Sequence, residues 1–146
     1  MRVADMLRAK ANGTAVMTVR PEETIRTLAQ RLQDEGIGAM IVSDDGSSLD
    51  GIISERDVTY GLAVHGERLH ALTVSALMTK VVITCSPKDS IAQVAQVMTQ
   101  RRIRHLPVKE GQRLVGVISI GDVLKHRLTE MQLEANVLRD IAIASR

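Results

Sequence analysis

A short pattern occurs twice in the chain, once in each half. Residues 51–57 read Gly-Ile-Ile-Ser-Glu-Arg-Asp, and residues 116–122 read Gly-Val-Ile-Ser-Ile-Gly-Asp. Each copy predicts a buried strand that runs directly into a helix, because the apolar residues stop at a Ser that suits a helix N-cap. A small repeated unit cannot bury its own sheet face, so the two units must pack together.

The duplication extends well beyond this pattern. Three further pairs of segments correspond: residues 3–7 with 74–78, residues 18–25 with 84–91, and residues 37–42 with 103–108. The element order predicted for each copy is strand, helix, strand, strand, helix. The fold class is therefore α+β, with two β-α-β-β-α repeats packed with pseudo-twofold symmetry and an extended C-terminal helix. We expect the first repeat at 1–65, the second at 66–128 and a helical extension at 129–146.

The local signals within each copy are of ordinary kinds. We expect a strand at 16–19 and at 81–85, and a hairpin turn at 44–48 and at 110–111. Pro21 and Pro87 suit the first turn of the following helix, and Ser86 with Asp89 suits a capping box. Apolar residues at helical spacing predict one buried face on each helix: Ile25, Leu28, Ala29 and Leu32 in the first copy, and Ile91, Val94, Ala95 and Met98 in the second.

The C-terminal tail carries a heptad-like apolar seam. Its members alternate steps of 4 and 3 residues: Leu124, Leu128, Met131, Ala135, Leu138 and Ala142. This helix either folds back onto its own core or pairs with a second chain. We favour the pairing, and hence a homodimer.

Composition excludes several classes of function. The chain has one Tyr and no Phe or Trp, whereas proteins that bind single-stranded nucleic acid stack bases on aromatic side chains. The net charge of +2 is too small to make nucleic acid or a membrane surface the expected partner. The lone Cys85 cannot form an internal disulfide and fits a reducing compartment. With no apolar run of membrane-spanning length and no signal peptide, we expect a cytoplasmic protein.

The duplicated motifs, each preceded by a proline-led helix and a hairpin, resemble the tandem cystathionine-β-synthase (CBS) domain pair, or Bateman module. The stretch Arg-His-Leu-Pro-Val at 104–108 is also typical of that family. The resemblance covers residues 1 to about 128. It implies a stand-alone regulatory protein that binds an adenosine-containing ligand in the cleft between its repeats.

The resemblance also implies which residues bind the nucleotide. Asp57 and Asp122 would accept hydrogen bonds from both ribose hydroxyls. Ser54 and Ser119, with the amides of the helix N-termini, would hold the phosphate side. The family's pocket is further lined by the strand before the first helix and by the first hairpin strand, whose residues here are Thr18 and Thr84, Ile37, Gly38 and Ala39, and His105, Leu106 and Pro107.

The two copies differ around their motifs. The second copy has Arg104 and His105 where the first has Gly38 and Ala39, so the second strand can offer cations to a phosphate. Arg56 directly precedes the Asp of the first copy. We expect Arg56, Arg104 and His105 to converge on phosphate, and occupation of one site or of both stays open.

The expected function is a regulatory sensor of an adenine nucleotide that signals to a separate effector protein. AMP is our first choice, ahead of ADP, ATP and NAD, with S-adenosylmethionine less favoured. The alternatives are an NAD(H) sensor and an oligomerisation module with vestigial sites, since Ser-x-x-Asp is also an ordinary capping arrangement.

Catalytic and metal functions are not expected. A hydrolase could be assembled from Ser119, His105 and Asp122, but the duplicate Ser54 has no matching histidine and no nucleophile elbow is present. Gly36-Ile37-Gly38 lacks the third glycine of a dinucleotide fingerprint. His65 and His70 read as loop residues, and no metal-ligand spacing occurs.

Overall fold

Each half of the molecule has its own small sheet. The computed structural model describes residues 1–10, 16–80 and 82–145. In the first half β1, β2 and β3 form one sheet, in which β1 and β2 are parallel and β2 and β3 antiparallel. In the second half β4 and β5 form an antiparallel pair. The strands are β1 (Thr18–Val19), β2 (Ala39–Val42), β3 (Gly51–Ser54), β4 (His105–Glu110) and β5 (Arg113–Ser119).

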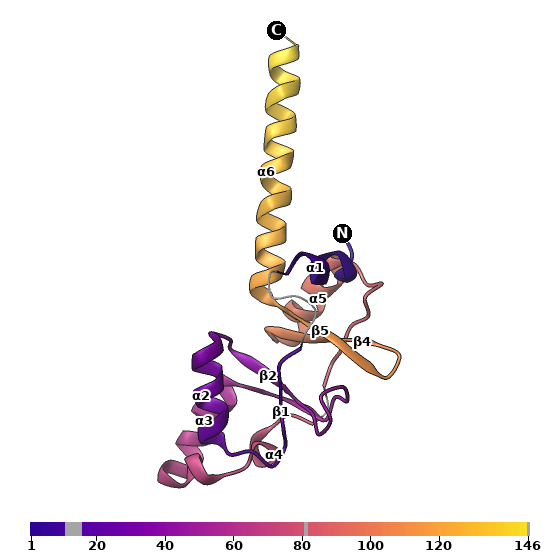
Figure 1. Cartoon of the computed structure of the whole chain (residues 1–146). Coiled ribbons are helices and arrows are strands. Elements are labelled where there is room, and N and C mark those ends of the chain that lie inside the picture. The colour runs from indigo at the N-terminus through magenta and orange to yellow at the C-terminus, as the bar shows by residue number, and fades with distance from the viewer. Residues whose placement is uncertain (11–15, 81, 146) are drawn as a thin grey trace.

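Helices surround the two sheets, and the long last helix extends away from the body (Figure 1). The helices are α1 (Val3–Ala9), α2 (Ile25–Glu35), α3 (Glu55–His65), α4 (Val74–Leu77), α5 (Ile91–Arg101) and α6 (Ile120–Ala144), with a 3-10 helix η1 (Gly66–Ala71) between α3 and α4. The predicted α+β fold of two related repeats with an extended C-terminal helix is confirmed. No helix within the described ranges has both the length and the apolar character needed to cross a membrane.

The same hydrogen bonds occur at matching places in both halves. Where β3 meets α3, the Glu55 N–H donates to the Gly38 carbonyl at 2.9 Å. Where β5 meets α6, the Ile120 N–H donates to the Arg104 carbonyl at 2.8 Å. Most residues of the predicted helix faces are buried as well, with Leu28 in the first half and Val94 in the second almost fully covered. Ala29 is the exception in the first half, because it is exposed.

The first strand of the second repeat is reduced to one bridged residue, which corrects the strand expected at 81–85. Cys85 pairs in parallel with Val108, while residues 82–84 form no strand and Val81 lies outside the described residues. The segment does not extend the sheet because Val82 and Ile83 line a cleft between the halves.

The two helices expected to begin at proline begin later. Pro21 and Pro87 lie in turns before α2 and α5. The capping box of α5 uses Ser90, whereas Asp89 Oδ2 accepts from the Ser86 N–H at 2.9 Å and closes the turn before it. These turns stay outside the helices because their carbonyls receive hydrogen bonds from α1 and α4.

The short helices α1 and α4 are exchanged between the halves. Helix α1 precedes the first half in the chain but packs on the second, and α4 precedes the second half but packs on the first. The Val3 N–H donates to the Asp89 carbonyl at 2.9 Å, and the Val74 N–H donates to the Glu23 carbonyl at 2.8 Å. Val3 is therefore buried in the core of the second half, and Val74 in the core of the first. Figure 1 shows α1 beside α5. The repeat boundaries named above remain predictions.

The two motif glycines make room for these crossing segments. A Cβ at Gly51 would lie 2.8 Å from the Thr79 carbonyl oxygen and 2.8 Å from Met78 Sδ. A Cβ at Gly116 would lie 2.5 Å from Leu7 Cδ2. Leu7 and Met78 occupy corresponding places in the duplicated segments, so each motif glycine accommodates the equivalent side chain.

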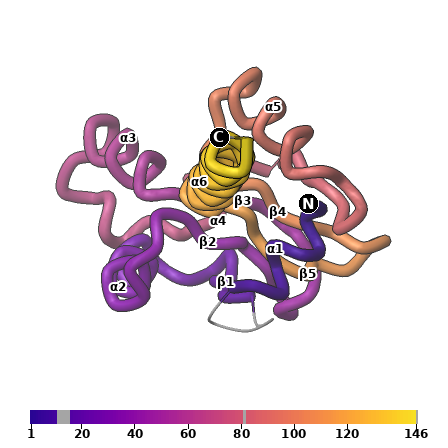
Figure 2. The backbone as a smooth tube through the Cα atoms, turned by 90° about the horizontal axis from the view of Figure 1, so that it is seen from above, coloured from indigo at the N-terminus to yellow at the C-terminus, as the bar shows by residue number. Residues whose placement is uncertain are grey.

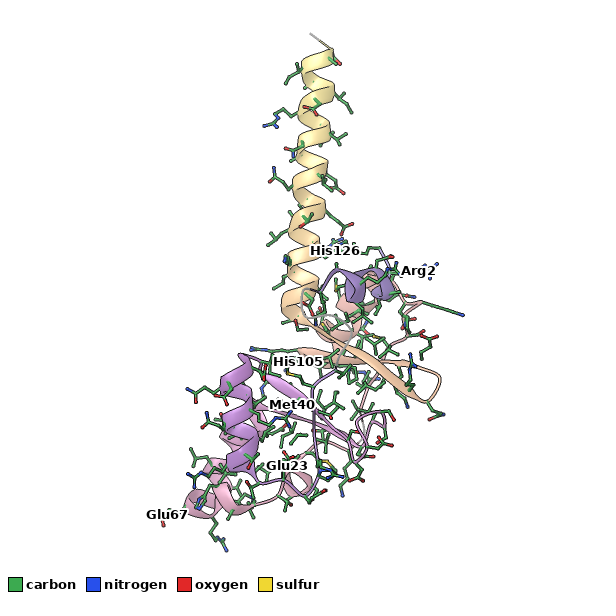
Figure 3. The ribbon with its side chains drawn as sticks, viewed as in Figure 1. Arg2, Glu23, Met40, Glu67, His105 and His126 are labelled. Atoms are coloured by element: carbon green, nitrogen blue, oxygen red, sulfur yellow. The ribbon has the colours of Figure 1, made fainter. Side chains whose placement is uncertain are left out.

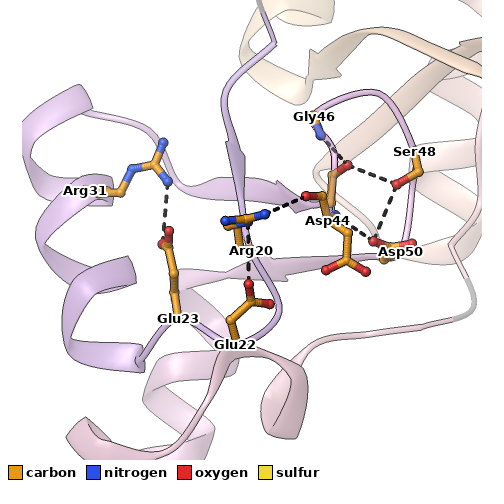
Figure 4. A network of polar contacts seen from close by, with 9 residues as sticks. Arg20, Glu22, Glu23, Arg31, Asp44, Gly46, Ser48 and Asp50 are labelled. Atoms are coloured by element: carbon orange, nitrogen blue, oxygen red, sulfur yellow. Dashed lines mark hydrogen bonds and ion pairs between the residues drawn. The ribbon is translucent and has the colours of Figure 1, made fainter.

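The turn between β2 and β3 is held by a polar network (Figure 4). The Asp44 N–H donates to Asp50 Oδ2 at 2.8 Å, and the Ser43 and Ser48 hydroxyls are 3.1 Å apart. Gly46 has a φ of 82°, a conformation that favours glycine. This confirms the turn expected at 44–48.

The C-terminal helix α6 does not fold back onto its own core (Figures 1 and 2). Near its start Val123 is buried. Farther along, Leu128, Met131 and Leu138 are 66%, 62% and 67% exposed. The apolar seam is thus presented to the surroundings.

Candidate functional site

Two clefts lie where the halves meet, and each contains one Asp of the duplicated motif. The Asp122 cleft has a volume of about 420 Å³ and the Asp57 cleft about 620 Å³. Both are within the range of about 300–1,000 Å³ that is usual for small-molecule sites. Each is lined by both halves, so neither half could form its cleft alone.

Ten of the fourteen expected nucleotide-binding residues line the clefts. The Asp122 cleft is lined by Ile37, Gly38, Ala39, His105, Ser119 and Asp122. The Asp57 cleft is lined by Gly38, Ala39, Ser54, Arg56, Asp57, Arg104 and His105. Gly38, Ala39 and His105 are common to both clefts and separate them.

Each motif Asp is held in a reciprocal capping box, because the N–H groups at a helix start need acceptors. In the first half the Ser54 N–H donates to Asp57 Oδ2 at 2.8 Å, and the Asp57 N–H donates to Ser54 Oγ at 3.3 Å. The corresponding distances in the second half are 2.9 Å and 3.1 Å, for Ser119 and Asp122. Neither Asp Oδ1 accepts a hydrogen bond from the part of the chain that the structure describes. Each carboxylate can therefore cap its helix and still present an oxygen to a ligand.

Asp122 has an additional partner that the sequence did not indicate. Lys10 Nζ donates to Asp122 Oδ2 at 3.0 Å and to the Val117 carbonyl at 2.9 Å. Burial by itself raises the pKa of Asp122, but the hydrogen bonds from Ser119 and Lys10 outweigh it and hold that pKa below the usual value. Asp122 is therefore a carboxylate at neutral pH.

The Asp57 cleft is rich in basic residues. Arg56, Arg102, Arg104 and His105 all line it. The structure thus brings the three residues expected to converge on phosphate to one cleft, and adds Arg102. Glu55 and Asp57 are the acidic residues that line the same cleft.

His105 lies at the junction of the two halves (Figure 3). The side chains of His105 and Glu55 both lie beside Gly38, because a Cβ on Gly38 would lie 3.6 Å from His105 Cε1 and 3.4 Å from Glu55 Oε1, which are ordinary contact distances. Burial lowers the pKa of His105, with Glu55 acting in the opposite direction. The imidazole is therefore neutral near pH 7 and can both donate and accept a hydrogen bond.

Four expected residues line neither cleft. The Thr18 carbonyl accepts from Arg31 at 2.8 Å in β1, and the Thr84 side chain is exposed. Leu106 is 1% exposed in the second core, and Pro107 is buried opposite Val117. Strand alternation explains Leu106, because its neighbour His105 faces the clefts.

Several residues that line the clefts were not expected. Among them are Lys10 and Met17 in the Asp122 cleft, and Glu55, Thr79, Ile83 and Arg102 in the Asp57 cleft. Arg102 belongs to the basic cluster at 101–105, which was a usable signal. Lys10 carried none, because nothing local links it to Asp122.

The carboxylates and basic side chains that line the clefts can bind a ligand through hydrogen bonds and charge. Within residues 1–10, 16–80 and 82–145, no group of three or more His, Cys, Asp or Glu side chains could hold a metal ion. In the same ranges Ser119 Oγ accepts from the Asp122 N–H, and no hydrogen bond joins it to His105.

Comparison with known proteins gives one consistent family. The CBS domain family model matches residues 12–63 and 74–129. The structure resembles the crystal structure of a CBS-domain containing protein from Agrobacterium tumefaciens, with 39% identity, a TM-score of 0.82, and coverage of 87% of this chain and 99% of that one.

Two other relatives are informative. A mitochondrial CBS domain-containing protein of Arabidopsis thaliana, CBSX3, is 29% identical over 84% of this chain, which spans 63% of that protein's length. The CBS domain pair of protein MJ0100, solved in complex with 5'-methylthioadenosine and S-adenosyl-L-methionine, is 25% identical with a TM-score of 0.74, covering 86% of this chain and 98% of that one. The duplicated fold, the paired motifs and these matches together show that the chain belongs to the CBS domain family, with one CBS domain in each half.

Proposed function

We propose that this chain is a regulatory, non-catalytic sensor that binds an adenine nucleotide, with AMP as the first candidate. The observation that carries the proposal is the repeated geometry of the clefts. In each, a capped Asp of one half faces strand residues of the other half, and one carboxylate oxygen accepts no hydrogen bond from the described residues. A ligand in such a cleft contacts both halves, so binding can favour one arrangement of the halves over another.

The ligand class follows from the chemistry of the walls. A carboxylate accepts both hydroxyls of a ribose diol through charge-assisted hydrogen bonds. The arginines of the Asp57 cleft and the start of α6 at Ser119 suit a phosphate. The MJ0100 complex supports an adenosine ligand in general, while the arginines favour a phosphate-bearing one, AMP before ADP, ATP or NAD.

The test is a thermal-shift panel on dialysed protein, using AMP, ADP, ATP, NAD, NADH and S-adenosylmethionine. A ligand at about a hundredfold over its dissociation constant stabilises by about 2.7 kcal/mol, which for a chain of this size raises Tm by on the order of 5–10 °C. We expect Asp57→Asn and Asp122→Asn together to abolish the shift. The exposed Asp140→Asn on α6 is the matched control and should keep it.

We also propose that two copies associate through α6. The exposed seam of Leu128, Met131 and Leu138 supports this, because isolated apolar residues are common on surfaces but a heptad-spaced row is not. A ligand-dependent change in the arrangement of the two halves could then alter the dimer, and this change could be detected by a separate effector protein.

The lone buried Cys85 supports a reducing compartment such as the cytoplasm.

One observation favours a second candidate function. The same α6 seam would serve an oligomerisation module whose clefts bind no nucleotide. A flat ligand panel from protein shown to be nucleotide-free, together with a stable dimer, would select this candidate instead.

A further inference from the structure

The two motif carboxylates are in different electrostatic situations. Asp122 forms an ion pair with Lys10 at 3.0 Å, and their side chains are 24% and 37% exposed. Asp57 has no ion-pair partner among the residues that the structure describes, and its Oδ2 accepts only from Ser54. Both halves have the capping box, but among the described residues only the Asp of the second half, Asp122, forms an ion pair.

Lys10 occupies acceptors that a ligand would need. The ammonium group donates to the Asp122 carboxylate and to the Val117 carbonyl, and both belong to the wall of the cleft. Ribose hydroxyls are donors that seek the same kind of acceptor. A diol that uses both oxygens of Asp122 must therefore take the place of Lys10 on Oδ2.

The fate of the displaced ammonium depends on the ligand. A neutral nucleoside breaks the ion pair and leaves Lys10 to water. A ligand with an anionic group brings a new partner into the same cleft, within reach of a flexible four-carbon side chain. A new ion pair between Lys10 and an anionic ligand thus offsets the free-energy cost of breaking the Lys10–Asp122 ion pair. A neutral ligand offers no such compensation.

We propose that Lys10 makes the Asp122 cleft selective for an anionic adenosine ligand over neutral adenosine. This inference rests on the proposed function and identifies a specificity residue of the same site. It also makes the two clefts unequal, since the cations of the Asp57 cleft are arginines that form no ion pair with Asp57 in the described residues.

The test compares AMP with adenosine by calorimetry in an Asp57→Asn background, which confines binding to the Asp122 cleft. Lys10→Met keeps the length of the side chain and removes its charge. We expect the ratio of the adenosine Kd to the AMP Kd to fall by about threefold or more, as suits a partly exposed ion pair. Lys10→Arg keeps the charge and should keep the ratio. Lys10→Gln replaces the Met variant if that one fails to fold.

Each outcome decides the matter. If both ligands tighten equally in Lys10→Met, Lys10 only competes with ligand, and selectivity by charge is wrong. If neither Kd changes in Lys10→Met, Lys10 has no role in binding, although the proposed function stands. If the Asp57→Asn parent binds neither ligand while the unaltered chain binds AMP, the inference is wrong because the Asp122 cleft is not used. If the unaltered chain binds neither, the proposed function fails and the inference with it.

Discussion

Asp57 and Asp122 illustrate how one residue can hold the fold and still serve a ligand. Each uses Oδ2 to cap a helix, at 2.8 Å and 2.9 Å from the preceding Ser N–H. The Asp residues that we propose to bind ribose are therefore also part of the framework. Losing such a cap costs about 1 kcal/mol, so the Asn variants proposed above need a stability measurement beside the binding assay.

His105 should make the free energy of unfolding depend on pH. Burial lowers its pKa from the ordinary value of 6.5, so below that pH the unfolded chain binds a proton more readily than the folded one. Its contribution to stability is therefore complete above the unfolded pKa and lost as the pH falls. We expect His105→Gln to reduce the fall in Tm between about pH 7.5 and about pH 5.5. The exposed His70→Gln is the control, and an unchanged pH dependence in His105→Gln would contradict the assignment.

At the scale of elements, the exchange of α1 and α4 joins the two halves, because each helix packs in the core of the other half. Val3 completes the second core and Val74 the first. Because Leu7 of α1 and Met78, directly after α4, lie against the motif glycines, these glycines matter for packing as well as for the strand-to-helix turn. The long-range docking of α1 and α4 should make the two halves unfold together.

We expect Gly51→Ala to destabilise the fold by about 1–3 kcal/mol, because overpacking of this size cannot be relieved by a side-chain rotation alone. The new methyl group would meet the Thr79 carbonyl, which is backbone. Gly116→Ala meets the flexible end of Leu7 and should cost less. Gly121→Ala, with its nearest neighbour 3.6 Å from the added Cβ, is the matched control. Urea unfolding gives the three values, and equal stability of Gly51→Ala and Gly121→Ala would refute the packing role.

At the scale of the whole molecule, the described part of the chain leaves most of α6 uncovered beyond the buried Val123. This helix extends from the second half with its apolar seam exposed (Figure 1). The Asp122 cleft lies at its start, since Ser119 caps α6 and Asp122 lies in its first turn. A change at the Asp122 cleft is therefore directly connected to the proposed dimer interface.

Replacing Met131 and Leu138 together by Glu should convert the dimer to a monomer, because two charges would face each other across the seam. Thr129→Glu with Asn136→Glu adds the same charge at the same spacing on the opposite face of α6, and should leave the dimer intact. Light scattering after size-exclusion chromatography distinguishes the two. A monomeric parent, or a double-Glu seam variant that stays dimeric, would rule out pairing through α6.

The sequence by itself predicted the duplicated α+β architecture, and ten of the fourteen residues that it assigned to the nucleotide site line the two clefts. The successful predictions rest on local patterns, which can be identified from a single sequence. They are the helical spacing at Leu28 and Val94, the turn at Gly46, and the helix caps at Ser54 and Ser119. The starts of α2 and α5 were misjudged because the turns at Pro21 and Pro87 are held by hydrogen bonds from distant helices. Leu106 was assigned to the pocket although strand alternation turns it to the core.

The tertiary structure alone decided which half each short helix joins, that His105 separates the two clefts, and that Lys10 reaches Asp122. The physical reason is the same in each case. These contacts join residues far apart in the chain, and no periodicity or turn signal records them. Lys10 and Asp122 are 3.0 Å apart in space, yet each has an ordinary local environment in the sequence, so only the packing of the two halves brings them together.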